Sequence, residues 1–497
     1  MINVINNIQN VSPPNPNSST LPPYREVLNQ LKQLLIDCPD VIGKRVVLQD
    51  GKEGYLLYVK GLIDLQEVYR LYVAPLLTLT LNALNNRDNI DKLPIAKVSY
   101  YYNIQSISDE IFKGSTILMF DGLGFALGAR LNSVTKRSIS EPQGEKSLKG
   151  SHEGFIEDLE TNISLLRRNI NSSSLKFKTL EISHVTKQKI LVAYIDGIAN
   201  GEILNTLLTK LKSINTDVLI DTGYIEHFIT DFPYSAYPQY QSTERIDKSV
   251  ASLMEGRLLI LLDGTPTVSI VPVTFFSFFQ AADDYSFNWI AAIFLRLIRI
   301  TAVALAVFLP ALYVALVSFH YYTLPLDLIV SLSRGRARVP FTPIMEALFM
   351  EITIELLREA ATRLPSYVGN TIGVVGGLVI GQAAVEAGIV GQLLLIVVAV
   401  TTIASYVIPN SDMALAIRLT RFACILFAGV FGMMGIVTAS ALIFAHLMVL
   451  ESLGQPYFQP LAPFKIKDIK DTFIRLPMKN NKKRPDTAKP TDNKRGK

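Results

Sequence analysis

The chain has 497 residues, of which 49% are hydrophobic and only 18% are charged, with a formal net charge of +5. Because an average soluble domain is about 25% charged, this composition excludes an ordinary soluble protein along the whole length. Two cysteines far apart in the sequence exclude a disulfide framework, and five scattered histidines offer no metal-ligand spacing, so we expect neither a metal nor a cofactor.

The first 23 residues are rich in Asn, Ser and Pro and contain no basic segment followed by an apolar one. This pattern predicts a disordered lead-in and not a secretory signal. Residues 24–285 have the composition of charged globular sequence. We therefore expect them to remain on the cytoplasmic side of a membrane, with the first long apolar run as the anchor.

Strand-like alternation begins at Arg45 and is interrupted by the turn dipeptide Asp50-Gly51. Apolar periodicity then predicts a helix over residues 65–84. The run GSTILMFDGLGFALGARL predicts a hairpin, with Asp121-Gly122 between its strands. This part of the chain is therefore expected to form a strand, a helix and a hairpin.

The same order of patterns returns later in the chain. The run from Tyr194 to Gly197 matches the run from Tyr58 to Gly61 at an offset of 136 residues, and Asp263-Gly264 matches Asp121-Gly122 at an offset of 142. Offsets this close indicate one duplication with a small insertion. We expect two α/β subdomains in tandem.

Each Asp-Gly pair is either a turn or the position of a functional carboxylate. Asp and Gly tolerate the positive φ angles of tight hairpins, so we assign Asp121, Gly122, Asp263, Gly264 and the nearby Pro266 to structural turns. The sequence contains no G-x-S-x-G motif, Walker-type loop or H-E-x-x-H motif. An enzyme would have no recognisable residues to use, and we expect none.

The first membrane-spanning segment is predicted over residues 300–319, which are twenty residues without a charge. At about 1.5 Å per residue, this run is long enough to cross a bilayer. Arg296 and Arg299 favour a cytoplasmic location for its N-terminal side, and Trp289 adds an interfacial aromatic. Pro310 in mid-span is expected to kink the helix.

Residues 364–417 contain no Lys or Arg and predict two further spans with a short turn between them. Glycines recur there at every fourth position, which gives a helix one bare face for close packing; helix flexibility is the alternative. These packing glycines are Gly369, Gly373, Gly377 and Gly381. Gln382 and Glu386 share a helix face, and a carboxylate at that depth is a functional candidate.

The last apolar stretch, residues 422–450, is too short for two full spans and long for one. Gly429, Gly432 and Gly435 would allow it to break into a re-entrant pair. We expect four to six membrane segments, and the sequence leaves their parity open.

Residues 341–364 predict an amphipathic helix with Pro343 in its first turn. Its notable residues are Glu351, Glu355 and Glu359, at i, i+4 and i+8 on one side, and Arg358 beside them. Such a stripe belongs either at the membrane interface or along a water-filled path, where rings of carboxylates in an assembly select cations. The alternative is local pairing, Glu355 with Arg358 or Glu359 with Arg363, on a solvated surface helix.

Basic residues are placed unevenly around the membrane region. Arg334, Arg336 and Arg338 crowd a loop that one preceding span would place outside, against the positive-inside tendency. Residues 465–497 hold twelve basic and four acidic residues, which predicts a disordered cytoplasmic tail attracted to anionic lipid. Phe473 is the one aromatic of this tail and no folded reader accompanies it, so we expect no nucleic-acid binding.

These patterns predict an α/β N-terminal region of two duplicated subdomains followed by an all-α polytopic membrane domain. The expected parts are a disordered N-terminus (1–23), subdomain 1 (24–135), a linker (136–154), subdomain 2 (155–285), the transmembrane domain (286–452) and a basic cytoplasmic tail (453–497).

Five segments have a more specific character: MEGRLLILLDGTPTVSIVPVTFFSFFQAADDY, PFTPIMEALFMEITIELLREAATRLP, VGNTIGVVGGLVIGQAAVEAGIV, SYVIPN and LAIRLTRF. Together they resemble the A subunits of bacterial spore germinant receptors, the GerA family. The likeness covers about residues 24–463. In the closing run SLGQPYFQPLAP, Leu453 and Gln455 depart from the Phe and Val usual in that family.

The resemblance implies an integral protein of the spore inner membrane that works with B and C subunits, helps to detect nutrients and triggers ion release. It also implies a homo-oligomeric, nutrient-gated cation channel, with nutrient recognition on the B subunit. The candidate channel or gating residues are then Glu351, Glu355, Arg358, Glu359, Gln382 and Glu386.

Two other classes stay open. A secondary transporter would need interrupted helices repeated within the membrane domain. The repeat in this sequence lies in the N-terminal α/β region, which disfavours a transporter. A membrane-anchored scaffold would conduct nothing and should tolerate Glu→Gln at the carboxylate stripe, whereas a cation path should not.

Overall fold

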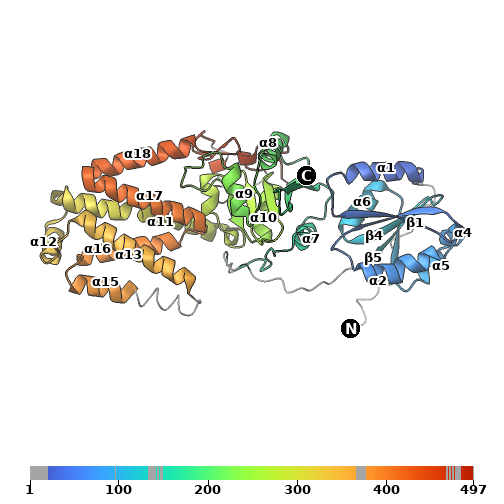
Figure 1. The fold of residues 1–497 in the computed structure, drawn as a ribbon, viewed down its shortest axis with the longest axis horizontal. Helices are drawn as coiled ribbons and strands as arrows, with labels where there is room; N and C mark the ends of the chain where they lie inside the picture. The colour runs from blue at the N-terminus through green and yellow to red at the C-terminus, as the bar shows by residue number, and fades with distance from the viewer. Residues whose placement is uncertain are drawn as a thin grey trace.

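The computed structural model describes residues 21–95, 97–131, 142, 145, 149–364, 377–465, 468–469, 472, 475 and 483–495. The molecule is elongated, with a helical part at one end and two sheet-containing subdomains at the other (Figure 1). The first subdomain is outermost, and the second lies between it and the helices.

The first subdomain is built on a five-stranded antiparallel sheet in the order β1-β2-β4-β5-β3. Its strands are β1 (Val41–Val47), β2 (Glu53–Val59), β3 (Val98–Tyr101), β4 (Ser115–Phe120) and β5 (Ala126–Arg130). Side chains alternate between the two faces of a strand, so Leu57 and Ile117 enter one core, and Leu56 and Leu118 enter the other.

Helices cover both faces of this sheet. On the first face lie α1 (Tyr24–Leu34) and α6 (Ile104–Phe112), and on the second lie α2 (Leu65–Val68), the π-helix η1 (Tyr69–Val73), α3 (Ala74–Leu77), α4 (Leu81–Asn85) and α5 (Arg87–Asp91). The helix predicted over 65–84 is therefore interrupted. The interruption falls at residues 78–80, where Thr80 caps the next helix by accepting from the Ala83 amide.

The second subdomain repeats this plan with the strand order β6-β7-β9-β10-β8. Its strands are β6 (Leu175–Ile182), β7 (Gln188–Ile195), β8 (Gln241–Thr243), β9 (Leu258–Leu262) and β10 (Val268–Val271). The covering helices are α7 (Leu159–Asn169) and α10 (Ile246–Met254) on one face, and α8 (Gly201–Lys212) and α9 (Thr222–Ile229) on the other.

The repeated dipeptides occupy equivalent places in the two sheets. Asp121-Gly122 joins β4 to β5, and Asp263-Gly264 joins β9 to β10. Both glycines have φ of +93°, the region that glycine adopts without strain. Each sheet also has a short edge strand, β3 or β8, that the sequence did not predict, because three or four residues give too few alternations to recognise.

The two subdomains meet through buried charge. The side chain of Arg167 is fully buried, and its Nε lies 2.6 Å from Oδ2 of Asp40. The same guanidinium lies over the rings of Phe112 and Phe177, at 4.5 and 4.8 Å. Arg167 belongs to the second subdomain and Asp40 to the first, so this pair fixes one against the other.

The chain continues from the second sheet through η2 (Phe275–Phe279) and η3 (Ala282–Tyr285) into the helical part. Its elements are α11 (Trp289–Ser318), η4 (Tyr321–Thr323), α12 (Leu326–Arg336), α13 (Pro343–Arg363), α15 (Gly377–Glu386), α16 (Gln392–Tyr406), α17 (Ser411–Phe431) and α18 (Met433–Val449). Among the described residues, α11 and α17 are long and apolar enough to cross a membrane, whereas α16 and α18 are shorter apolar helices. The α/β region followed by helices confirms that part of the predicted fold class.

We call the end of the helical part that contacts the second subdomain its near end, and the end at which α12 lies its far end (Figure 1). At the near end, Asp284 pairs with Arg299 at 2.7 Å and Arg296 at 3.2 Å, both in α11. At the far end, the chain turns between α17 and α18 at Gly432, whose φ is +59°. The break thus occurs at one of the three glycines at which the sequence allowed it.

Helices α17 and α18 return along each other at very close range. A Cβ placed on Gly435 of α18 would overlap the backbone carbonyl of Phe427 in α17. A Cβ on Gly429 would likewise overlap the Ile344 side chain of α13. Two glycines of this group are therefore required for helix packing.

After α18 the chain folds back onto the second subdomain through the short hairpin of β11 (Glu451–Ser452) and β12 (Gln455–Pro456), and later through η7 (Asp486–Ala488). Ser452 donates to the Gln239 carbonyl at 2.8 Å, and the Thr491 amide donates to the Ile198 carbonyl at 2.9 Å. The sequence predicted a disordered tail, whereas the described residues 483–495 contact the second subdomain through hydrogen bonds and an ion pair that composition does not reveal. The predicted linker, 136–154, lies mostly outside the described residues.

Candidate functional site

The carboxylate helix forms as the sequence predicts. Helix α13 runs from Pro343 to Arg363, and Pro343 occupies its first turn, where the missing amide hydrogen is no loss. Its three stripe carboxylates share one side but meet three different environments.

Glu351 is buried between α13 and α17. It forms an ion pair with Arg421, and the two side chains are only 2% and 3% exposed. Within the described part of the chain, Oε1 of Glu351 and both Nε and one terminal nitrogen of Arg421 have no hydrogen-bond partner. Glu351 is therefore held inside the bundle by a partner from α17.

Glu355 lies where α13, α16 and α17 meet. Its Oε1 is 3.2 Å from Nε of Arg418, and its Oε2 is 3.7 Å from Arg358. Arg358 also donates to Ser405 at 2.9 Å and lies over the Tyr406 ring at 4.7 Å. One carboxylate is thus shared by two arginines from different helices.

Glu359 faces outward. It pairs with Arg363 at 2.5 Å, and both side chains are largely exposed. This is the local i, i+4 pair that the sequence offered as the alternative to a channel lining. Glu359 is the stripe carboxylate with the greatest exposure to solvent.

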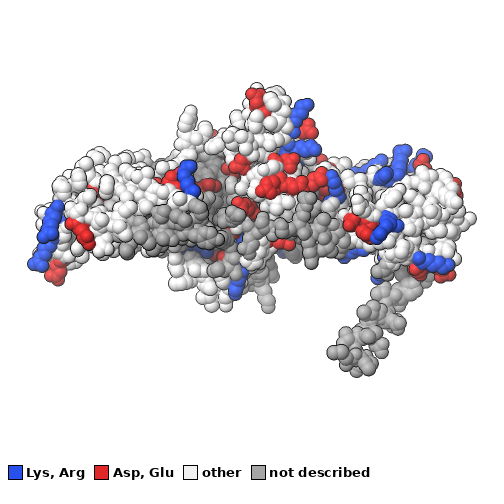
Figure 2. Space-filling view, turned by 60° about the horizontal axis from the view of Figure 1, so that its bottom comes forward, with Lys and Arg blue, Asp and Glu red and all other residues white. Residues whose placement is uncertain are grey.

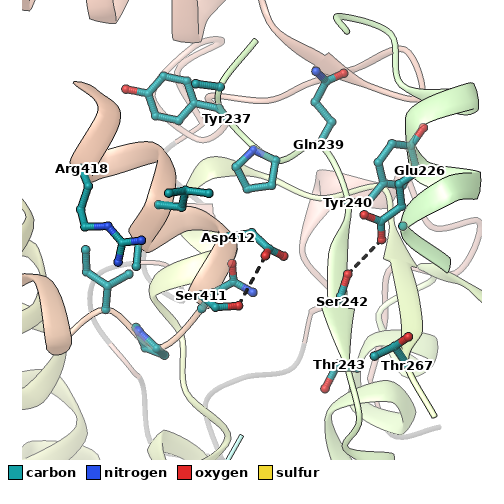
Figure 3. A pocket seen from close by; sticks show the side chains of 18 of the residues that line it. Glu226, Tyr237, Gln239, Tyr240, Ser242, Thr243, Thr267, Ser411, Asp412 and Arg418 are labelled. Atoms are coloured by element: carbon teal, nitrogen blue, oxygen red, sulfur yellow. Dashed lines mark hydrogen bonds between the residues drawn. The ribbon is translucent and has the colours of Figure 1, made fainter. Parts of the chain in front are cut away.

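A large cavity opens beside Glu355 and Glu359, between the second subdomain and the near end of the helical part (Figure 3). Its volume is about 980 Å³. Residues from α9 and β8 form one wall, and residues from α13, α16 and α17 form the other. The charged residues of its lining are Glu145, Asp221, Glu226, Glu244, Glu355, Arg358, Glu359, Asp412 and Arg418.

Glu226 is the central acidic group of the α9 wall. Ser269 and Ser242 donate to its Oε1 at 2.6 and 3.0 Å. Burial raises the pKa of this carboxyl above its usual value, more than the two hydrogen bonds lower it, and the negative charges of Asp412 and Asp221 raise it further. The carboxyl group of Glu226 therefore binds its proton more tightly than a free glutamic acid does.

The segment 231–240 connects this wall to the helices. Tyr237 Oη lies 3.1 Å from Oγ1 of Thr420 in α17, and Ser235 Oγ lies 2.9 Å from Nε2 of His446 in α18. The second subdomain is therefore in direct contact with α17, the helix that supplies the arginine partners of Glu351 and Glu355, and with α18.

Comparison with known proteins identifies the family. Residues 29–487 match the family described as Bacillus/Clostridium GerA spore germination protein. The chain belongs to the GerA spore germination family. Spore germination protein B1 of Bacillus subtilis (strain 168) is 39% identical over 94% of this chain and 97% of its own length. Spore germination protein A1 of the same organism is 37% identical over 89% of this chain and 92% of its own.

Another relative of this GerA-family chain is the uncharacterized membrane protein YfkQ of Bacillus subtilis (strain 168), 36% identical over 94% of this chain and 91% of that protein. Among solved structures, the N-terminal domain of the A subunit of the Bacillus megaterium spore germinant receptor GerK3 aligns with a TM-score of 0.38 and 24% identity. That alignment covers 52% of this chain and 98% of the solved one.

The other described residues predicted for gating or helix packing, on α15, are not among those that line the cavity. Gln382 donates to Glu386 at 3.1 Å on the exposed side of α15. A Cβ on Gly381 would meet Leu395 of α16 at 2.8 Å, whereas one on Gly377 would meet nothing within 4 Å. The other two glycines of the predicted face, Gly369 and Gly373, lie outside the described residues.

The predicted turn residues have structural contacts. The Asp121 amide donates to the Glu53 carbonyl at 2.9 Å, and Oδ1 of Asp263 accepts from the Leu159 amide at 3.4 Å. Pro266 lies in the turn that follows Gly264. In the portion of the chain that the structure describes, no group of three or more His, Cys, Asp or Glu side chains is placed to hold a metal.

Sequence reasoning missed the partners of the stripe. Arg418 and Arg421 lie three residues apart on α17 and pair with Glu355 and Glu351, which lie four residues apart on α13. It also missed Glu346, whose fully buried side chain lies 2.9 Å from Arg336 and accepts from the Gly391 amide at 3.0 Å. Two complementary charge stripes on neighbouring apolar helices were the available signal.

Proposed function

We propose that this chain is the membrane subunit of a spore nutrient-germinant receptor and that several copies form a nutrient-gated cation channel. Family membership supports the receptor, and the two long apolar helices support the membrane location. Carboxylates select cations when they line a water-filled path, and α13 supplies them at the near end.

The arrangement of the termini supports an even number of membrane crossings. The subdomains precede α11, and the described tail residues follow α18, yet Thr491 donates to the Ile198 carbonyl of the second subdomain. Two segments in contact lie on one side of a membrane. We place both on the cytoplasmic, or spore-core, side of the spore inner membrane.

Successive helices support six crossings, the upper end of the expected four to six. Helix α11 leads from the near to the far end, α13 returns to the cavity, and α16 also ends at the cavity with Tyr406. Helix α17 leaves from Ser411 at the cavity, and α18 returns to His446 beside Ser235. Between the end of α13 at the cavity and the start of α16, the proposal requires one further outward crossing.

The observation on which the proposed gate depends is the sharing of Glu355 by Arg418 and Arg358. In this arrangement the two guanidinium groups neutralise the carboxylate. Separation of α13 from α17 would free Glu355 for passing cations. Residues 231–240 contact α17 and α18, so a movement of the second subdomain would reach these helices. Nutrient binding elsewhere in a complex with B and C subunits would drive the separation if the nutrient binds more tightly to the state in which α13 and α17 are apart.

Cation release from spores after nutrient addition tests this function. We compare wild type with Glu355→Gln and Glu359→Gln at matched protein levels, with Glu181→Gln, an exposed strand carboxylate in the second subdomain, as the control. Slower release from the two α13 variants alone supports the cation path. Unchanged release from both would refute it and favour a membrane-anchored scaffold.

A further inference from the structure

The far end of the helical part contains an apolar crevice beneath α12. Its volume is about 630 Å³. Apolar side chains from α11, α12 and α13 line it, with Ser333 and Arg336 among its polar residues. The apolar lining includes Val317, Leu324, Ile329, Leu332 and Ile344.

Helix α12 itself is unusual for a packed element, because none of its residues is buried. Leu326 and Val330 are 74% and 42% exposed, and the preceding Tyr321 and Tyr322 are 60% and 68% exposed. Exposed Tyr side chains at the end of a membrane-length helix are typical of the interface between lipid tails and head groups. Helix α12 beside them combines exposed apolar residues with two arginines in its last turn.

The position of α12 is nevertheless fixed. Arg336 pairs with Glu346 of α13 at 2.9 Å, and Glu346 also accepts from the Gly391 amide. This contact leaves Arg334 and Arg338 directed to the surface, and neither has an ion-pair partner among the residues that the structure describes. Figure 2 shows the helical part as mostly uncharged surface, with basic and acidic side chains side by side at its far tip. Asp327, the acidic residue of α12, lies about two turns before Arg334.

We propose that this crevice binds one anionic phospholipid, with an acyl chain beneath α12 and the head-group phosphate against Arg334 and Arg338. Val317 at the end of α11 lines the crevice, and the adjoining Phe319 and Leu328 are 42% and 39% exposed, so apolar surface borders its opening. Guanidinium groups bind phosphate oxygens through paired hydrogen bonds. Phosphate binding also explains why arginines occupy the side of the membrane that the positive-inside tendency disfavours.

This inference rests on the proposed membrane topology but not on ion conduction. The test titrates the detergent-purified full chain with phosphatidylglycerol or phosphatidylcholine and counts bound lipid by native mass spectrometry. The variants are Arg334→Gln/Arg338→Gln, which removes the phosphate contacts, and Ile329→Trp, which fills the crevice. The control is Lys92→Gln/Lys187→Gln, which removes the same charge from exposed positions of the two subdomains.

We expect wild type and control to prefer phosphatidylglycerol. One basic residue at an anionic surface changes affinity about fivefold, so the double arginine variant should lose phosphatidylglycerol affinity by about 25-fold and keep its affinity for phosphatidylcholine. Ile329→Trp should weaken both lipids alike.

Equal phosphatidylglycerol affinity of wild type and the double arginine variant overturns the proposal. If the double arginine variant changes its oligomeric state but not its lipid binding, the surface around Arg334 and Arg338 contacts a second copy of this chain, which would also overturn the lipid proposal. A wild-type chain that stays monodisperse without detergent would refute the membrane topology itself, which keeps the two failures distinct.

Discussion

Replacing Glu351 by Gln leaves the Arg421 charge buried without a carboxylate partner in the described part of the bundle. The two side chains are 2% and 3% exposed, so water cannot compensate for the lost charge. Removal of one partner from a buried pair costs about 3–5 kcal/mol, whereas replacement of both by apolar residues of similar size is neutral or stabilising. For a helical part of this size, each kcal/mol lowers Tm by about 2–4 °C, which gives a fall of about 6–20 °C.

The assay is thermal unfolding of the detergent-purified chain, followed by near-UV circular dichroism. Glu351→Gln should show the full fall in Tm, and Glu351→Leu/Arg421→Met should regain the wild-type value. Glu359→Gln, which breaks an exposed pair, should change stability by less than about 1 kcal/mol. A double variant as unstable as the single one, or equal Tm values for Glu351→Gln and Glu359→Gln, would rule out an uncompensated Arg421 charge as the cause.

Three further predictions follow from contacts in other parts of the molecule. Arg167→Met should destabilise the N-terminal region by about 3–5 kcal/mol in chemical denaturation, whereas Lys60→Met, which breaks an exposed pair, should change it by less than about 1 kcal/mol. Gly435→Ala should destabilise the helical part by about 1–3 kcal/mol, and Gly377→Ala, where the added methyl meets no atom, should not; equal Tm values for the two variants would contradict the close packing. Because burial raises the pKa of Glu226, the folded state binds this proton more tightly than the unfolded state does. The free energy of unfolding should therefore increase as pH falls from the raised pKa to the ordinary value near 4.5, with no further gain below that value. Glu226→Gln should remove that dependence from unfolding scans at a series of pH values, and its persistence would contradict the assignment.

The tandem N-terminal plan could be predicted from the sequence because its signals are local. Asp121-Gly122 and Asp263-Gly264 lie at equivalent turns, and each needs only its neighbours to adopt its conformation. The edge strand β8 could not be predicted, because its three residues pair with β10 through contacts distant in sequence. Helix α13 was predicted for the same local reason, from periodicity and Pro343.

The arrangement of charges around the candidate site could not be predicted in the same way. Periodicity places Glu351, Glu355 and Glu359 on one side of a helix, but it does not say which helix faces them. Tertiary packing brings Arg421 to the first and Arg418 to the second, and leaves the third exposed. The cavity likewise depends on α9, whose residue Glu226 precedes Glu355 by 129 residues. The periodicity of α9 gives no indication that this helix faces the helical part.

The most direct test of the central claim is the ion selectivity of the reconstituted receptor complex. We would record currents across a planar bilayer under a KCl gradient, with nutrient present, for wild type and Glu355→Lys. We expect a cation-selective reversal potential for wild type and a shift toward the chloride potential for the variant, since a lining carboxylate becomes a lining ammonium. Nutrient-dependent currents with the same reversal potential in both proteins would contradict a cation path along α13.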